Sequence, residues 1–520
     1  MTHADRRDVG SSVSTSPLGW RVGGSAENRW RAGGRAAGRR RAGGGPVEGE
    51  RSRLGALPRE QKEGKDNMKL RKLARGPLVP TAVVALIASV CGPVGAGSAS
   101  ATSLEAAAAL PKPVRGSSIT IDYHYPAPPK ALLNEFTAQT GVKVNWVEVG
   151  WDPLQVKIAT AMESNSYFAD LTDVDWSKVG EYYKTKWFIP LNSDFNLSAL
   201  SGDMPQLSSF SSHGQQYAIP FDAGFTVTTW NAAIAKKAGI TTAPTTLSAY
   251  TADLQKIKAK GILASPLDIP FAAAEGLSTY WYQLTAAFGG EVLNANYKPM
   301  FTSPSSAGYK AMTWMVNAYK SGLVPKANIN DTDYGAFTSE MAEGRVASVF
   351  SDYSGNVGSL YDVPSMSKVV GQVEYLPVPG VSGPAPDLAN PDGIGIPKTA
   401  KNVAGALAFI NWFTNTKNQA IWAGLDGPND VVPTFGGPAR ISSMDLLAKT
   451  KLVVAAGEQE IIKLFKVSRA EFPGPGAPPW YPQFSNAVYT NIHQAAAGSE
   501  TVAQAVSAIA SEVQQLNASS

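Results

Sequence analysis

Aromatic and acidic side chains gather at the ends of three successive β-strands that the sequence predicts early in its folded part. These residues are Tyr123, His124 and Tyr125 after the first strand, Trp151 after the second, and Asp175 and Trp176 after the third. Aromatic rings stack on the apolar faces of sugars, and carboxylates accept hydrogen bonds from hydroxyl groups. The pattern therefore predicts a site for a neutral polyol, although any single tryptophan of this kind could equally be a core residue.

The elements that carry these residues alternate between strands and helices. Alternating apolar residues predict strands at 118–123, 142–149 and 171–174, and apolar residues at helical spacing predict helices at 129–140 and 154–163. This β-α-β-α-β order implies a parallel sheet with right-handed crossovers. Because ligands of open α/β sheets bind at the carboxyl ends of the strands, we expect the three strand ends to line one site.

Residues 214–231 are expected to pass from one lobe of the molecule to another. The segment reads as a long β region that is interrupted between Pro220 and Gly224. Proline lacks the N–H that a strand ladder uses, and glycine accepts unusual backbone angles. Asp222 lies inside the interruption, so we expect its carboxylate beside a cleft between the lobes.

Composition separates the first hundred residues from the rest of the 520-residue chain. Residues 1–101 contain 18 Lys and Arg against 8 Asp and Glu, whereas the remainder contains 28 against 34. The body therefore presents no charge pattern typical of nucleic-acid binding. The only cysteine is Cys91, in the first segment, and three widely spaced histidines follow it. Thiolate zinc sites, disulfides and cysteine nucleophiles are excluded from the body.

The N-terminal segment divides into an extension, an export signal and a linker. Residues 1–67 are rich in Gly, Arg and Ser, which predicts disorder; we interpret them as an untranslated or non-functional extension, with a nucleic-acid-binding tail as the alternative. Residues 68–101 combine a basic start, a short apolar run and an Ala-Ser-Ala end, typical of a cleaved secretion signal peptide. Residues 102–117 read as a linker. Lipid anchoring at Cys91 stays open, although Val90 is bulkier than lipoprotein signals usually have at that place.

The body of the chain resembles a known family over residues 118–516. The segments FTAQTGVKVNWVEV, ADLTDVDWSKVGEYYKTKWFIPLN and GQQYAIPFDAGFTVTTWNAAIAKKAG are similar to extracellular solute-binding proteins of ABC importers, in the carbohydrate-binding, maltodextrin-binding-protein-like branch. The resemblance implies an α/β, two-lobed periplasmic-binding-protein fold of type II. Each lobe would be a mainly parallel sheet flanked by helices, joined by a hinge of several crossings. The expected lobes are 118–222 with 393–440, and 223–392 with 441–516.

The same resemblance adds candidates for the cleft. The segment at 391–396 resembles the return to the first lobe, which makes Asp392 a partner for Asp222 across the hinge. A helix start that faces the cleft in the family carries an aromatic triplet here, of which one ring is expected to contact ligand. The further candidates are Tyr280, Trp281 and Tyr282 in that triplet, Asp352 and Tyr353 at a strand end, and Trp480 and Tyr481 before the last helices.

The resemblance implies a receptor that closes over a sugar or oligosaccharide and delivers it to the permease subunits of an ABC transporter. We expect an exported monomer, extracellular, periplasmic or at the cell surface, with no catalytic residue, cofactor or metal. Two alternatives stay open: a secreted glycosidase that uses two carboxylates, or the same fold with another solute, such as an iron chelate, polyamine or peptide. An iron site would use Tyr123, His124 and Tyr125, but adjacent residues rarely chelate one ion together.

Overall fold

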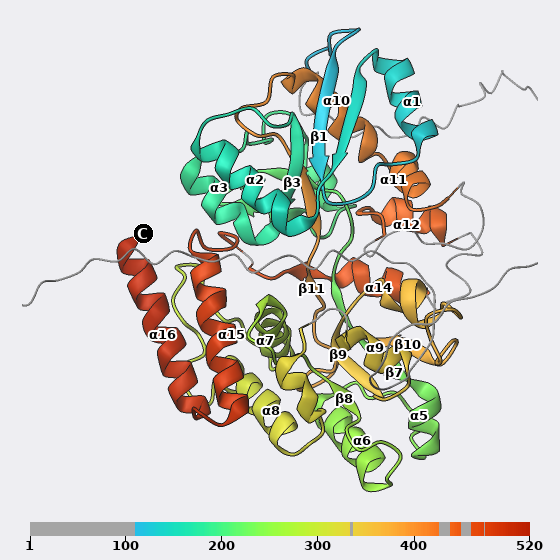
Figure 1. Cartoon of the computed structure of the whole chain (residues 1–520), viewed down its shortest axis with the longest axis vertical. Helices are drawn as coiled ribbons and strands as arrows, with labels where there is room; N and C mark the ends of the chain where they lie inside the picture. Colours follow the sequence, from blue (N-terminus) through green and yellow to red (C-terminus); the bar gives the residue numbers. More distant parts are fainter. Residues whose placement is uncertain (1–109, 333–335, 426–436, 449–458, 473) are drawn as a thin grey trace, which may run out of the picture. The chain divides into compact units, whose positions relative to one another are not determined.

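A computed structural model describes residues 110–332, 336–425, 437–448, 459–472 and 474–520. Over these ranges the chain forms two lobes, each built on its own β-sheet (Figure 1). The sheet of the first lobe has the strand order β2-β1-β3-β12-β6. Its strands are β1 (Ser118–Tyr123), β2 (Lys143–Glu148), β3 (Leu171–Asp175), β6 (Ala218–Pro220) and β12 (Asp392–Gly395).

Helices cover this first sheet, and α2 and α10 both pack against β1. Asn402 caps α10 by accepting the backbone N–H of Gly405 at 3.0 Å, and its amide donates to the carbonyl of Ser118 at 2.9 Å, which ties the helix to β1. The elements around the sheet are α1 (Lys130–Thr140), α2 (Trp151–Glu163), α3 (Val179–Thr185), α4 (Leu197–Ser201), α10 (Val403–Phe413), α11 (Thr416–Trp422), α12 (Ile441–Leu447), η1 (Trp176–Lys178), η2 (Leu207–Phe210), and the paired strands β4 (Ser211–Ser212) and β5 (Gln215–Gln216).

The sheet of the second lobe has the strand order β10-β7-β9-β8. Every residue of β7 is buried, as expected for a central strand rich in β-branched residues. The strand β7 runs antiparallel to β9 and β10, whereas β8 and β9 are parallel. The strands are β7 (Thr226–Asn231), β8 (Leu267–Asp268), β9 (Ser348–Tyr353) and β10 (Val373–Leu376).

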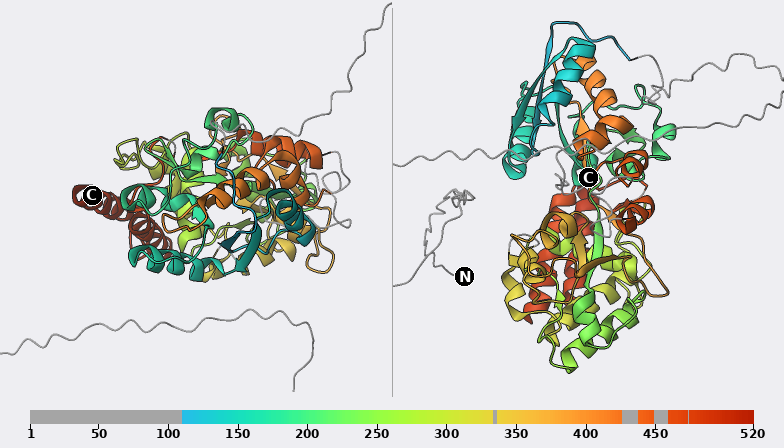
Figure 2. Two further views of the ribbon diagram at one scale, coloured as in Figure 1. Left: turned by 90° about the horizontal axis from the view of Figure 1, so that it is seen from above. Right: turned by 90° about the vertical axis from the view of Figure 1, so that its right-hand side faces the viewer.

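Four long helices form a layer of the second lobe, in which α7 packs against α8 and α15, and α15 packs against α16 (Figures 1 and 2). Thr501 and Gln504 form a capping box that starts α16. The elements of this lobe are α5 (Ala232–Lys237), α6 (Leu247–Ala259), α7 (Glu275–Ala287), α8 (Ala307–Lys320), α9 (Ala336–Ala342), α14 (Gln459–Val467), α15 (Tyr481–Ala497), α16 (Val502–Ser519), the 3-10 helix η3 (Lys326–Asn330) and the π-helical turn η4 (Val357–Tyr361).

Extended passages of the chain connect the two sheets. The chain leaves the first sheet after β6 and enters the second at β7. It returns through β11 (Leu388–Ala389), which pairs with β13 (Arg469–Ala470), and then forms β12. The outgoing and returning passages lie side by side, because Phe225 and Ala389 form a β-bridge.

The predicted two-lobed α/β fold is confirmed, but the strand directions are more mixed than the expected mainly parallel sheets. The first three strands are parallel, whereas β12 runs antiparallel to both β3 and β6. The reason is connectivity. The chain reaches β12 from the other lobe instead of through a helix on the same sheet, so the rule for β-α-β crossovers does not govern its direction.

Several expectations concern residues outside the described ranges. They are the extension at 1–67, the secretion signal at 68–101 and the lipid anchor at Cys91. Within the described ranges, no helix has the length and apolar character needed to cross a bilayer. The helix α12 packs against both α11 and α14, so the expected lobe boundary at residue 440 stays a prediction.

Candidate ligand-binding site

One hydroxyl group joins the two carboxylates of the crossing passages. The hydroxyl of Tyr125 lies 2.9 Å from Oδ2 of Asp222 and 2.9 Å from Oδ2 of Asp392. The backbone N–H of Asp392 also donates to Oδ1 of Asp222 at 2.8 Å. A hydroxyl has one proton, so two such contacts require a second proton on one of the acids. Burial, and then the charge of Asp392, raises the pKa of Asp222 to about 7.

His124 brings a positive charge to the same place. Its Nε2 lies 3.3 Å from Oδ2 of Asp392, and its ring stacks on the ring of Tyr123 with 5.1 Å between centroids. Burial lowers the pKa of His124, but the charge and hydrogen bond of Asp392, together with the charge of Asp173, outweigh burial and raise the pKa to about 9. The imidazole is therefore protonated at neutral pH in this arrangement.

Two further carboxylates come from β3. Asp173 and Asp175 are two residues apart on one strand, so their side chains leave the same face of the sheet. Asp175 lies opposite Asp392 in the register of β3 and β12, and it accepts the backbone N–H of Ser177 at 2.7 Å. Asp173 is fully buried and accepts the side-chain amide of Gln155 at 2.9 Å. Burial, and then the charge of Asp392, raises the pKa of Asp173 well above its usual value.

Asp173 is the member of this cluster that the sequence analysis missed. The sequence-based prediction considered only residues at the carboxyl ends of strands, whereas Asp173 lies in the middle of β3. A signal was present, since an acid inside an otherwise apolar buried strand requires polar partners. The structure brings together the predicted residues Tyr123, His124, Tyr125, Asp175, Asp222 and Asp392.

Trp151 differs from the other predicted aromatic residues in its exposure. It begins α2, and 40% of its surface is accessible to solvent. The parallel register of β1 and β2 pairs Tyr123 with Glu148, so Trp151 and Tyr125 follow neighbouring strand ends. An exposed indole offers a flat apolar surface of the kind that suits the face of a sugar ring.

Trp176 lies in an aromatic contact between the lobes. Its ring centroid is 5.2 Å from that of Tyr481 and 6.1 Å from that of Phe472, and all three rings are buried. Its indole N–H donates to Oδ1 of Asn390, in the passage that returns to the first lobe, at 2.6 Å. This residue therefore links the first lobe to both the second lobe and the crossing.

The aromatic triplet of α7 lies in the core of the second lobe. Tyr280, Trp281 and Tyr282 are each at most 3% exposed. The indole N–H of Trp281 donates to the carbonyl of Gly308 at 2.8 Å, and the hydroxyl of Tyr280 donates to the carbonyl of Asp268 at 3.2 Å. This burial speaks against contact with a ligand, and the expected ligand role of one ring stays a prediction without support from the geometry.

The carboxylate of Asp352 is occupied by donors of its own lobe. It is 0% exposed and accepts hydrogen bonds from the hydroxyls of Thr229 at 2.7 Å and Tyr361 at 2.8 Å, and from the amide of Asn356 at 2.5 Å. Its neighbour Tyr353 is half-buried. These contacts give Asp352 a role in holding β9 to η4 and β7.

Trp480 and Tyr481 lie at the start of α15 and are buried. The hydroxyl of Tyr481 donates to the carboxylate of Glu275, and the hydroxyl of Ser485 donates to the same carboxylate at 2.6 Å. Glu275 begins α7, so this cluster joins the two helices. The ring of Trp480 packs edge-on against Tyr297 at 5.8 Å between centroids.

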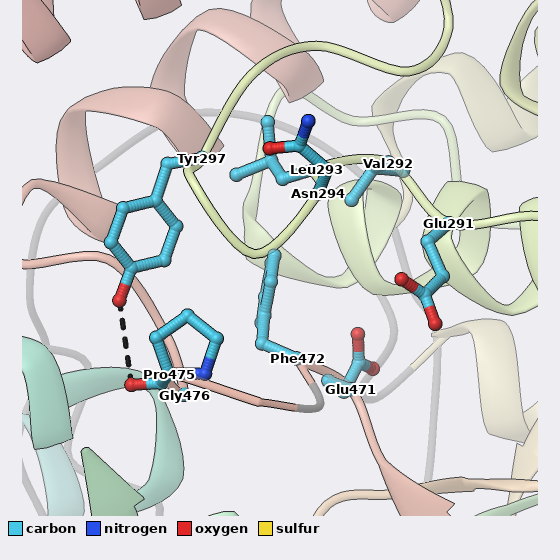
Figure 3. Close-up of a pocket in the computed structure, with 9 residues that line it drawn as sticks. All are labelled: Glu291, Val292, Leu293, Asn294, Tyr297, Glu471, Phe472, Pro475 and Gly476. Carbon is cyan, nitrogen blue, oxygen red and sulfur yellow. Dashed lines mark hydrogen bonds between the residues drawn. The ribbon is translucent and has the colours of Figure 1, made fainter. Parts of the chain in front are cut away.

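A small hollow lies apart from the acidic cluster, beside Phe472 and Tyr297 (Figure 3). The carboxylates of Glu291 and Glu471 lie on one side of it, and the hydroxyl of Tyr297 donates to the carbonyl of Pro475 at 3.4 Å on the other. None of the residues predicted from the sequence lines this hollow.

Two α/β lobes joined by several passages of the chain are the architecture of a two-lobed binding protein, and acidic and aromatic side chains gather where these passages leave the first sheet. The model of the family described as "Bacterial extracellular solute-binding protein" matches residues 122–420, which is more than half of the chain. The chain belongs to this family. No curated protein matches the sequence.

Solved structures agree on the fold. Maltose-bound MalE3 of T. maritima is 20% identical, with a TM-score of 0.61 over 77% of this chain and 100% of that one. A solute-binding protein of Agrobacterium radiobacter K84 in complex with ribitol is 20% identical, with a TM-score of 0.61 over 78% of this chain and 100% of that one. The cyclic alpha-maltosyl-1,6-maltose binding protein of Arthrobacter globiformis is 19% identical, with a TM-score of 0.61 over 78% and 100%.

Proposed function

We propose that this protein is an extracytoplasmic receptor that binds a sugar, oligosaccharide or sugar alcohol between its lobes and delivers it to an ABC importer. The proteins of similar fold were solved with maltose and ribitol, and one is named for a cyclic maltosyl-maltose. All three solutes are neutral and carry many hydroxyl groups. The acidic and aromatic composition of the candidate site suits the same class of solute.

The observation that carries this proposal is the group of acidic and aromatic side chains where the chain passes between the lobes, in which the hydroxyl of Tyr125 contacts both Asp222 and Asp392. Asp392 keeps 17% of its side chain accessible, so an oxygen of this group can accept a hydrogen bond from a solute hydroxyl. Trp151 offers a flat apolar surface for the face of the solute.

Delivery requires that the closed form be stabilised by the solute. A solute that contacts both lobes at once favours the closed form over the open form. The free energy by which it shifts this equilibrium equals the difference between its binding free energies for the two forms. We assign no catalytic role to Asp222, because its carboxylate already binds Tyr125 and the backbone of Asp392. Export, a monomeric state and docking to permease subunits are part of the same proposal.

A thermal-shift screen of neutral sugars and sugar alcohols tests the proposal. A ligand present at about one hundred times its Kd stabilises the folded protein by about 2.7 kcal/mol, which should raise Tm by several degrees. Matched screening of amino acids, polyamines and iron chelates provides the comparison. Shifts only in the second panel would replace the sugar with another solute class.

A further inference from the structure

Three side chains of types that bind metals converge beneath the crossing. His124 follows β1, Asp173 lies in β3 and Asp392 opens β12. One ligand atom from each lies within 4.8 Å of the other two, and Nε2 of His124 is 3.3 Å from Oδ2 of Asp392. The three residues are distant in sequence, so the fold brings them together.

Two of these groups keep buried polar atoms without partners. Asp173 is 0% exposed; Gln155 donates to its Oδ2, but no described residue donates to its Oδ1. Nδ1 of His124 is also buried without a hydrogen-bond partner in the described part of the chain, but the ring nitrogen that faces Asp392 is Nε2. Such atoms are rare in protein interiors, because they lose the hydrogen bonds of water and gain none. Such atoms also occur elsewhere in the described ranges, for example in Asp268 and Asp387; Oδ1 of Asp173 is distinguished by the two other potential metal ligands near it.

In the described ranges, the side chains of Lys and Arg do not neutralise the carboxylates of this cluster. In those ranges, no Lys or Arg forms an ion pair with Asp173 or Asp392, and His124 is the partner of Asp392. By contrast, Asp122 of the adjacent strand β1 is paired with Lys157 at 2.5 Å. The imidazole of His124 is thus the cationic partner of Asp392 in the described ranges, and a bound metal ion would take the place of its proton.

We propose that His124, Asp173 and Asp392 form a binding site for a divalent metal ion, with zinc the favoured ion. Imidazole and carboxylate groups bind zinc at about 2.0–2.2 Å, which places neighbouring ligand atoms of a tetrahedral site about 3.4 Å apart. The separation of 3.3 Å between His124 and Asp392 already meets this spacing, and an inward shift of Asp173 completes the set. Binding displaces the proton from the imidazole.

Neighbouring residues already orient the three ligands. Gln155 holds Asp173 at 2.9 Å, the hydroxyl of Tyr125 holds Asp392 at 2.9 Å, and the ring of Tyr123 stacks on His124. Metal sites use such contacts to fix the direction of their ligands. Three protein ligands leave the fourth position of a tetrahedral ion open for water or for a hydroxyl of a bound solute. The proposal differs from our expectation from the sequence that no metal binds, and the titration below decides between the two.

Calorimetric titration of the full-length protein with zinc tests the site, after removal of metals with EDTA and without an affinity tag. We expect one zinc ion per chain, and magnesium binding at least about 100-fold weaker, because magnesium prefers oxygen ligands and keeps its water. His124→Asn and Asp173→Asn should each weaken zinc binding at least about tenfold. The matched control is His213→Asn, at a histidine that packs on Tyr183, and it should leave zinc binding unchanged.

A second measurement covers the case in which a cluster variant fails to fold. Zinc should raise the Tm of the wild-type protein, and EDTA should reverse the change. Absence of both heat and a Tm shift at millimolar zinc, or full zinc affinity in folded His124→Asn and Asp173→Asn proteins, would overturn the proposal. Because no sugar is used, failure of the metal site is distinguishable from failure of the proposed function.

Discussion

Single residues at the crossing owe their properties to burial near other charges. Asp222 is 2% exposed and shares the hydroxyl of Tyr125 with Asp392, so two carboxyl groups lie against one hydroxyl. Sequence reasoning found both acids because proline and glycine mark the interruption around one, and the family resemblance marks the other. Asp173 could not be found in this way, because its role depends on contacts between strands that no local pattern specifies.

Replacement of Trp151 tests the aromatic side of the site. Trp151→Ala should weaken sugar binding more than about tenfold, because the loss of a stacking ring removes apolar contact with the solute. The unfolding free energy should change little, since the ring is 40% exposed. Calorimetry with the best sugar from the screen measures the first effect and thermal melting the second.

The matched control lies on the same helix. Val156 is 66% exposed in α2, and Val156→Ala should leave both sugar affinity and Tm unchanged. If Trp151→Ala and the wild-type protein bound sugar equally well, the indole of Trp151 would be an exposed surface group that does not contact the sugar.

A buried glutamate in the second lobe should make stability depend on pH. Burial, and then the charge of Glu275, raises the pKa of Glu471, while Arg469 lowers it; the net result is well above the usual value. The folded state therefore binds this proton more tightly than the unfolded state, and the unfolding free energy falls as the pH rises above the unfolded pKa of about 4.3. Glu471→Gln should raise Tm at about pH 8 and lose this advantage near pH 4.

Thermal melting across this pH range measures the difference between the variant and the wild-type protein. Glu374, an exposed glutamate in β10, provides the control, and Glu374→Gln should follow the wild-type curve throughout. A constant difference between Glu471→Gln and wild type at every pH would contradict the account.

At the level of elements, the sequence indicates where helices and strands occur better than which face each one buries. One ring of the aromatic triplet of α7 is expected to contact a ligand; this stays a prediction, and the helix buries eleven of its 13 residues. The cause is that α8 and α15 both pack on α7. A helix covered on more than one side has no amphipathic pattern from which its orientation can be predicted.

The two passages that connect the lobes pack so closely at Gly224 that an added methyl group would disturb their contact. A Cβ at Gly224 would lie 2.2 Å from the carbonyl oxygen of Asn390 and 3.2 Å from Cα of Pro391. Because these contacts are with backbone, Gly224→Ala should force the two passages apart and lower the unfolding free energy by about 1–3 kcal/mol.

Denaturant unfolding measures this effect against a matched glycine. Gly202 ends α4 in a helical conformation, and a Cβ there meets its nearest atom at 3.8 Å. Gly202→Ala should stay within about 0.5 kcal/mol of the wild-type protein. Equal stability of the two variants would show that the passages tolerate separation.

At the level of the whole molecule, the order of segments predicts the family and the two-lobed fold, whereas the site requires the structure. The chain passes out of the first lobe and back, so residues from β1, β3, β6 and β12 meet although they lie far apart in sequence. Because the chain enters β12 from the other lobe, this strand runs antiparallel to β3 and β6. The order of neighbouring elements in the sequence does not predict this direction. The order of segments therefore predicts the fold, whereas the grouping of the acidic side chains depends on how distant segments pack together.

The central claim is that the protein captures a neutral polyol. Isothermal titration with maltose, a linear maltooligosaccharide and ribitol tests it most directly, with spermidine as the charged comparison. We predict saturable heat with one site per chain for at least one of the neutral solutes, and its loss in Trp151→Ala. Binding of spermidine, with no heat from any neutral polyol, would contradict the claim.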